Sequence, residues 1–283
     1  SATFLPDTMS GNLKNGIVSL EVSGSNVKFE GCDNLGAIQP GGSIVASDAT
    51  VFATFTDSRK TGKSSINNGL VISATTYFKK FSSNGSQGDI ARAAGSRATI
   101  SVYFSDLSRN HGIVRADRID FINTAKNEKT GTVSATVPGV FFKDKSVNLG
   151  NVTARFTFEG DSSNAIGGIA RHESLSIFPE YQVSHFRGDS INHGFVSSCP
   201  VSAQLNYDLM APYKPGGNMA VNCCERSEFG SGANFVHFSE NSKNRGKAEG
   251  CIKLFDQFIN YNIVQGKVAI LATGAINAHL QCA

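Results

Sequence analysis

The chain has 283 residues, of which 40 % are hydrophobic and 17 % are charged, and its formal net charge is +3. The apolar content, with 20 Phe and 6 Tyr, excludes an intrinsically disordered chain. No run of 18 or more apolar residues occurs, so no membrane-spanning helix is expected. Ser, Asn, Thr and Gly are abundant beside Val, Ile and Phe, a balance typical of a turn-rich β protein.

Alternation of apolar and polar residues is the main structural signal along the chain. Residues 1–14 lack periodicity and are expected to form an extended arm before one large β domain over residues 15–283. In the central block Ile100, Val102 and Phe104 share one face of an expected strand. A Gly-, Ser- and Asn-rich segment at residues 159–168 is a possible boundary within this domain. Strands are expected near residues 18–22, 27–29, 51–55, 70–78, 97–105, 119–121, 133–142, 147–158, 175–178, 201–209 and 268–272.

The connections between these segments favour an antiparallel fold. A short link at residues 143–145 predicts that 133–142 and 147–158 pair as antiparallel neighbours. Apolar residues at helical spacing predict one helix over residues 247–261. No internal repeat is evident. Because parallel strands need crossover connections of about a dozen residues, usually helical, the pattern predicts an antiparallel β-sandwich or jelly-roll-like barrel with one helix near the C-terminus and long Gly/Asn/Ser loops.

Positive charge is concentrated in the middle of the chain. Residues 58–130 contain twelve Lys or Arg and five Asp or Glu, a net charge of +7. The favoured interpretation is a set of scattered, solvated charges, and the alternative is a basic surface that binds nucleic acid, anionic lipid or acidic glycan. The segment that contains Arg59, Lys60 and Lys63 ends like a phosphate-binding loop, but Asp57 occupies the position of the required Gly. These three residues are therefore kept as weak binding candidates on a basic surface turn.

The cysteines suggest an oxidising compartment. Six are present, which permits three disulfides and favours an extracellular or secreted protein. The alternative is buried free thiols in a particle assembled inside the cell. The disulfide candidates are Cys32, Cys199, Cys223, Cys224, Cys251 and Cys282.

One turn carries two short motifs. Arg187-Gly188-Asp189 is the tripeptide by which many extracellular ligands engage receptors, with Arg and Asp projecting in opposite directions from a Gly turn. The overlapping block Gly188-Asp189-Ser190-Ile191 resembles the nucleophile segment of a lipase and esterase family. The Asp-x-x-His pair that this family needs near the C-terminus is absent, so the motif predicts no catalytic residue.

Two histidines flank this turn and are further binding candidates. His185 and His193 could meet beside it, but no His or Cys spacing typical of a zinc site occurs, and no metal or cofactor is predicted. Asn84 and Asn151 begin glycosylation acceptor sequences. Asn151 is the poorer acceptor because it lies in an expected strand.

The absence of a catalytic constellation in the sequence favours a non-enzymatic protein. We expect an extracellular or particle-surface structural or binding protein, adhesin-like or self-assembling, that recognises itself or a protein or glycan receptor through loops. The alternatives are a virion coat subunit, a membrane-binding or pore-forming β protein that uses residues 51–56 and 70–78 as a hairpin, and a carbohydrate-active hydrolase with a site assembled across strands.

Overall fold

The structure is a computed structural model that describes residues 2–4, 17–20, 26–40, 52–58, 61–91, 99–172, 183–198, 235–255, 257–265, 268–270, 276–277 and 280–281. The chain divides into two compact units, unit 1 (Ser1–Ala135) and unit 2 (Thr136–Ala283). The described residues of both units form strands and turns without a helix. Consequently, no helix within these ranges is long and apolar enough to cross a membrane.

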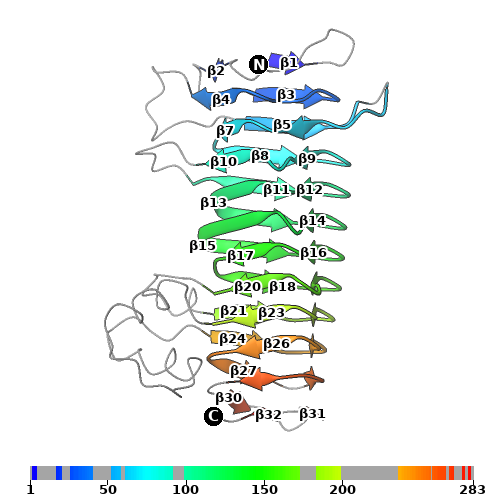
Figure 1. The fold of residues 1–283 in the computed structure, drawn as a ribbon, viewed down its shortest axis with the longest axis vertical. Helices are drawn as coiled ribbons and strands as arrows, with labels where there is room; N and C mark the ends of the chain where they lie inside the picture. The colour runs from blue at the N-terminus through cyan, green and yellow to red at the C-terminus, as the bar shows by residue number, and fades with distance from the viewer. Residues whose placement is uncertain are drawn as a thin grey trace, which may run out of the picture. The chain divides into compact units, whose positions relative to one another are not determined.

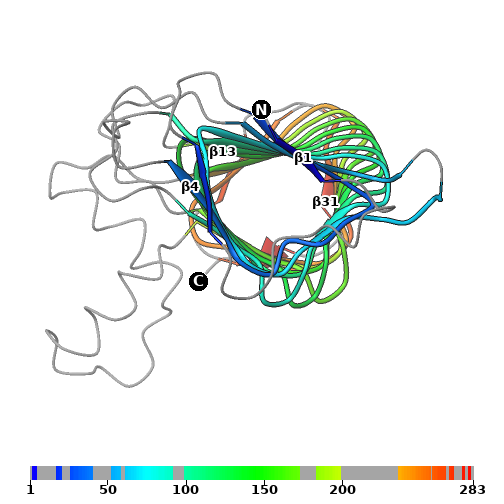
Figure 2. The same cartoon turned by 90° about the horizontal axis from the view of Figure 1, so that it is seen from above.

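Each unit is a parallel β-solenoid. Successive coils of the chain place equivalent strands side by side, and every strand pair assigned among the described residues is parallel (Figure 1). The view in Figure 2 shows the strands of a coil surrounding an interior, which the inward side chains fill. Each regular coil contributes a strand that ends near a Phe, a two-residue strand that ends in Asn, and a third strand.

The strands of unit 1 are β1 (Ala2–Phe4), β2 (Ile17–Leu20), β3 (Asn26–Glu30), β4 (Ala37–Pro40), β5 (Phe52–Thr56), β6 (Ile66–Asn67), β7 (Leu70–Ile72), β8 (Thr75–Phe78), β9 (Ser83–Asn84), β10 (Asp89–Ala91), β11 (Ser101–Phe104), β12 (Arg109–Asn110), β13 (Ile113–Phe121) and β14 (Lys126–Asn127). The unit boundary falls within β15 (Thr132–Phe142).

The strands of unit 2 are β16 (Val147–Asn148), β17 (Asn151–Thr153), β18 (Phe156–Phe158), β19 (Ser163–Asn164), β20 (Ile169–Arg171), β21 (Val183–Phe186), β22 (Ile191–Asn192), β23 (Phe195–Ser197), β24 (Phe235–Phe238), β25 (Lys243–Asn244), β26 (Lys247–Glu249), β27 (Ile252–Leu254), β28 (Ile259–Asn260), β29 (Val264–Gln265), β30 (Val268–Ile270), β31 (Ile276–Asn277) and β32 (Leu280–Gln281).

Stacked Phe rings, which we call the Phe ladder of each unit, fill one side of the interior. Neighbouring rings are 4.6–5.0 Å apart between centroids and nearly coplanar, and all are fully buried. Because parallel pairing keeps equivalent residues in register, each ring meets the ring of the next coil. The ladder consists of Phe29, Phe55, Phe78, Phe104 and Phe121 in unit 1, and of Phe142, Phe158, Phe186 and Phe238 in unit 2.

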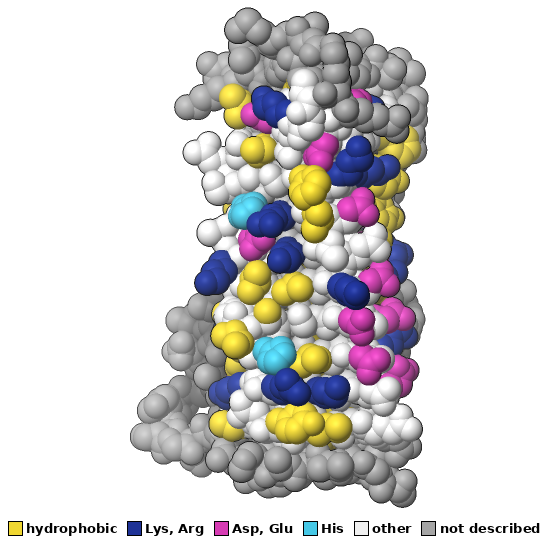
Figure 3. Space-filling model, turned by 90° about the vertical axis from the view of Figure 1, so that its right-hand side faces the viewer, with side chains coloured by type: hydrophobic (Ala, Val, Ile, Leu, Met, Phe, Trp, Pro, Cys, Tyr) yellow, Lys and Arg dark blue, Asp and Glu magenta, His cyan; other side chains and the backbone are white. Residues whose placement is uncertain are grey.

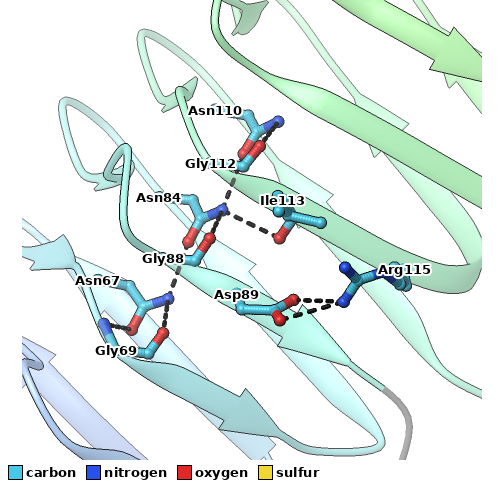
Figure 4. Close-up of polar contacts among 9 residues, drawn as sticks. All are labelled: Asn67, Gly69, Asn84, Gly88, Asp89, Asn110, Gly112, Ile113 and Arg115. Carbon is cyan, nitrogen blue, oxygen red and sulfur yellow. Dashed lines mark hydrogen bonds and ion pairs between the residues drawn. The ribbon is translucent and has the colours of Figure 1, made fainter.

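A column of buried Asn side chains, which we call the Asn ladder, lies where the two-residue strands end and the chain turns. In unit 1 the Asn84 Nδ2 donates to Asn110 Oδ1 at 2.9 Å and to the Gly88 carbonyl at 3.3 Å (Figure 4). Each amide thus binds the next coil and its own turn, which satisfies polar groups that have no access to water. The ladder consists of Asn34, Asn67, Asn84, Asn110 and Asn127 in unit 1, and of Asn148, Asn164, Asn192, Asn244 and Asn260 in unit 2.

Glycine follows the Asn ladder where two coils approach closely. A Cβ on Gly112 would meet the carbonyl oxygens of Gly85 and Gly88 in the preceding turn. Since real Cβ atoms do not approach backbone oxygens so closely, the position requires Gly. Asn84 cannot be a glycosylation site in the folded chain, because its side chain is fully buried. Asn151, in contrast, lies exposed at the start of β17.

The predicted antiparallel sandwich is therefore wrong, although the predicted β class is correct. Residues 133–142 and 147–158 do not form a hairpin: Val140 pairs with Phe156 in parallel, and Val147 belongs to a strand of the other sheet. Residues 51–56 and 70–78 also fail to form a hairpin, because Phe52 pairs with Thr75 in parallel register.

The predicted helix over residues 247–261 is also wrong. The segment forms β26, β27 and β28 instead. Of the residues whose spacing predicted the helix, Cys251, Ile252 and Phe258 are buried from successive sides of one coil, whereas Phe255 and Ile259 are only partly buried. A coil that turns a corner every few residues therefore imitates the helical period.

The predicted framework of three disulfides does not form. Cys32 is a buried thiol whose sulfur lies 3.6 Å from the Glu30 carbonyl oxygen. Three disulfides would need all six cysteines, so the expectation of three is wrong. Cys199, Cys223, Cys224 and Cys282 lie outside the described residues.

Candidate functional site

The outer surface of β18, β21, β24 and β27 in unit 2 concentrates rings and positive charge, and we call it the imidazole face. Phe158, Phe186 and Phe238 point inward from these strands, so the alternate residues point outward. Parallel register places His185 opposite His237 and His237 opposite Lys253. The face comprises Arg155, His185, Arg187, Phe235, His237, Lys253 and Phe255.

The rings of this face contact one another across the coils. The imidazoles of His185 and His237 are 5.3 Å apart between centroids and perpendicular. The Phe255 ring lies 5.1 Å from His237, and the Lys253 ammonium lies 4.1 Å from the Phe235 ring centroid. Such edge and cation contacts hold the side chains in fixed orientations. The face therefore offers an ordered set of rings, one or more from each of the coils that contain β21, β24 and β27.

Both imidazoles are neutral at physiological pH. Burial, followed by the nearby positive charges of Arg155 and Arg187, lowers the pKa of His185 to about 4. Burial, followed by His185 and Lys253, lowers the pKa of His237 to about 4. The Nε2 atom of His237 is buried and has no hydrogen-bond partner among the described residues. A neutral imidazole can donate one hydrogen bond and accept another, which suits the recognition of hydroxyl groups at a ring nitrogen that solvent reaches, unlike this buried Nε2.

Acid is expected to destabilise unit 2 through these two imidazoles. In the unfolded chain they bind protons near pH 6.5, whereas in the fold they do so only near pH 4. Between these values the unfolded chain binds more protons, so the free energy of unfolding falls as the pH falls from 6.5 to 4. Thermal unfolding midpoints across this range should decline less steeply in H185F/H237F than in the native chain. Parallel curves would contradict the assignment.

The receptor-type tripeptide lies in an ordinary corner of the solenoid. Gly188 has a φ of +66°, and the residues at the same place in other coils, such as Lys80 and Asp106, also have positive φ. Arg187 is exposed and its Nη2 donates to Glu159 Oε2 at 2.9 Å. The Gly188 N–H donates to Glu240 Oε2 at 2.6 Å, and Asp189 is exposed. The motif is accessible, but its backbone shape is that of every comparable turn.

The other sequence candidates are not brought together. His185 belongs to the imidazole face, whereas His193 follows β22 of the second sheet, where partial burial and Arg245 lower its pKa. Lys63 is exposed in unit 1. Arg59 and Lys60 lie outside the described residues. No three His, Cys, Asp or Glu side chains within the described ranges are grouped so that they could hold a metal ion.

A Ser–His contact in unit 2 bears on the alternative of a hydrolase. The Ser184 Oγ lies 2.7 Å from His172 Nδ1, and the same Oγ accepts the N–H of Phe156 at 2.9 Å. Both side chains are fully buried inside the coil. A catalytic nucleophile must reach its substrate. This buried contact therefore stabilises the interior of the coil and does not form an exposed catalytic pair.

Sequence reasoning identified His185 but missed its partners His237, Phe235, Lys253 and Phe255. A signal was present, because His precedes the ladder Phe in both β21 and β24. Fifty-two residues separate the two histidines in the sequence, so only the parallel register reveals their contact. Comparison with family models, with curated proteins and with solved structures finds no match to this chain.

Proposed function

We propose that the chain is a non-catalytic binding protein that uses a rigid solenoid to present the imidazole face to an extended glycan. The observation that carries this proposal is the register-paired contact of His185 with His237, flanked by the rings of Phe235 and Phe255. Sugar rings combine apolar C–H faces with hydroxyl groups. Aromatic rings suit the former and neutral imidazoles the latter.

The repeat of the solenoid supports a polymeric rather than a small ligand. Neighbouring parallel strands are about 4.8 Å apart, so the face offers a new contact at each coil along one direction. Arg155 and Lys253 add positive charge, whereas the charge of Arg187 is paired with that of Glu159. This balance favours a glycan that carries carboxylate or sulfate groups over a neutral one.

The proposal is tested by glycan-array binding of the full chain, followed by calorimetric titration with the oligosaccharides retained. We expect binding to acidic oligosaccharides. Phe255→Ala should weaken it about tenfold, since truncating a contacting aromatic side chain costs on the order of 1–2 kcal/mol. Circular dichroism would verify folding of the variant.

A matched control is available in unit 1. Tyr103 also points outward from a Phe-ladder strand and stacks on Tyr77, with ring centroids 5.2 Å apart. Tyr103→Ala should leave the dissociation constant unchanged. Equal effects of Tyr103→Ala and Phe255→Ala, or retention of no acidic oligosaccharide, would count against the imidazole face as the binding surface.

A further inference from the structure

The turn that follows the Phe-ladder strands of unit 1 has an unusual surface, which we call the lysine corner. Phe81 and Leu107 occupy the same place in two successive coils, three residues after Phe78 and Phe104, and are 59 % and 41 % exposed. Lys63, Lys79 and Lys80 are exposed at the same corner, and so is Asp106 on the Leu107 coil, whose Oδ1 accepts a hydrogen bond from Asn123 Nδ2. Figure 3 shows exposed hydrophobic side chains beside Lys and Arg on this side of the molecule.

The equivalent turn of unit 2 has the opposite character and is here called the acidic corner. At the places of Phe81 and Leu107, two successive coils carry Asp161 and Asp189, both exposed. Glu159 and Glu240 lie in the same set of turns, and Arg187 is paired with Glu159. The preceding coil, with Lys143 and Lys145 beside Asp144, is mixed in charge and is not part of this corner.

We propose that the lysine corner docks on the acidic corner of a second copy of this chain. Both corners consist of the turn that follows the Phe-ladder strand, and in both this turn repeats at the strand spacing of about 4.8 Å. Lys63 on one coil and Lys79 and Lys80 on the next can therefore face carboxylates on two successive coils without a change of spacing. Contact would also remove Phe81 and Leu107 from water, which favours association.

Charge argues against the simplest alternative, in which two lysine corners meet. That contact would set Lys79 and Lys80 of one copy against the same residues of the other, and like charges placed together oppose association. Pairing with the acidic corner exchanges this repulsion for attraction. The interaction uses the turns and leaves the rings of the imidazole face free. The two surfaces share Arg187, which is paired with Glu159.

Sedimentation equilibrium of the full chain tests the proposal. We expect concentration-dependent self-association that weakens between 50 mM and 500 mM NaCl, because salt screens exposed charges. K79E/K80E in unit 1 and D161K/D189K in unit 2 should each raise the dissociation constant about tenfold or more. K126E/K129E makes the same change in net charge on a different part of unit 1 and should associate like the native chain.

Mixing the two reversed variants provides the decisive measurement. K79E/K80E and D161K/D189K should associate with each other at least as tightly as the native chain does, because each reversed corner meets a reversed partner. This rescue also shows that both variants are folded. A native chain that stays monomeric at low salt, or a mixture no tighter than its separate components, would overturn the proposal. Failure here leaves the glycan titration of Phe255→Ala unaffected, so the two hypotheses are tested independently.

Discussion

Phe186→Ala is expected to lower the free energy of unfolding by about 3–5 kcal/mol, the range for truncating a fully buried Phe. Its ring is completely buried between those of Phe158 and Phe238, at centroid distances of 4.7 and 4.8 Å, and Phe156 packs edge-on against it at 6.0 Å. Truncation would remove buried apolar surface and leave a cavity. Because the rings of Phe158 and Phe238 both lose a stacking partner, we expect the surrounding residues to fill this cavity only poorly.

The measurement is denaturant unfolding followed by two probes, with Phe195→Ala as the matched control. Phe195 lies on the outer surface of β23 in the same unit, partly exposed, and contacts Arg171 and Lys247 through its ring. Phe195→Ala should lower the free energy of unfolding by about 1 kcal/mol or less, as for surface substitutions that lose a cation–π contact. Phe186→Leu should cost less than about 1.5 kcal/mol, the usual limit for swaps of similar volume, since Leu254 continues the same column naturally. Equal losses for Phe186→Ala and Phe195→Ala would contradict a stabilising ladder.

The β class could be read from the sequence because alternation reports two-faced strands. Val102 and Phe104, expected on one face, are both fully buried in β11. Alternation does not distinguish parallel from antiparallel pairing, since side chains alternate in both. The antiparallel choice rested on the need for long crossovers between parallel strands. In this fold the connection between one strand and its parallel neighbour in the next coil consists of the other strands of the coil, not of a helix.

The repeat was missed because its period varies. Consecutive members of the Asn ladder in unit 2 are separated by 16, 28, 52 and 16 residues. Insertions at one corner, such as the one between β23 and β24, shift the period without disturbing the strands that follow. A constant interval did exist: Asn follows Phe by six residues in Phe78/Asn84, Phe104/Asn110, Phe121/Asn127, Phe142/Asn148, Phe158/Asn164, Phe186/Asn192 and Phe238/Asn244.

The candidate surface could not be derived from local patterns for a related reason. The contact between His185 and His237 depends on which residues of distant coils share a register, and that depends on where each insertion lies. The Asn residues were interpreted as loop composition, because Asn usually favours exposed turns. Here the amides bind one another in a buried column, which reverses the usual meaning of the residue.

Asn164→Ala is expected to lower the free energy of unfolding by about 3 kcal/mol, because a buried polar group deprived of its partner costs about 1–3 kcal/mol. Asn164 Nδ2 donates to Asn192 Oδ1 at 2.8 Å and to the carbonyls of Gly168 and Phe195, and its Oδ1 accepts from Asn148 Nδ2 at 2.7 Å. Alanine removes all of these contacts at once. Asn151→Ala, at an exposed position of β17 in the same unit, should lower the free energy of unfolding by less than about 0.5 kcal/mol.

Asn164→Asp separates the hydrogen bonds from the packing, because the two side chains have nearly the same shape. Ionised Asp can accept but not donate, so the Asn192 oxygen would face a buried carboxylate. Burial and this oxygen should raise the pKa of the new carboxyl. The free energy of unfolding of the Asn164→Asp variant should therefore rise, relative to that of the native chain, as the pH falls toward 4. Urea unfolding of both chains at pH 7 and pH 4 gives this difference and cancels the contribution of the imidazoles. A difference that does not change with pH would mean that the ladder amide is replaceable by any side chain of its size.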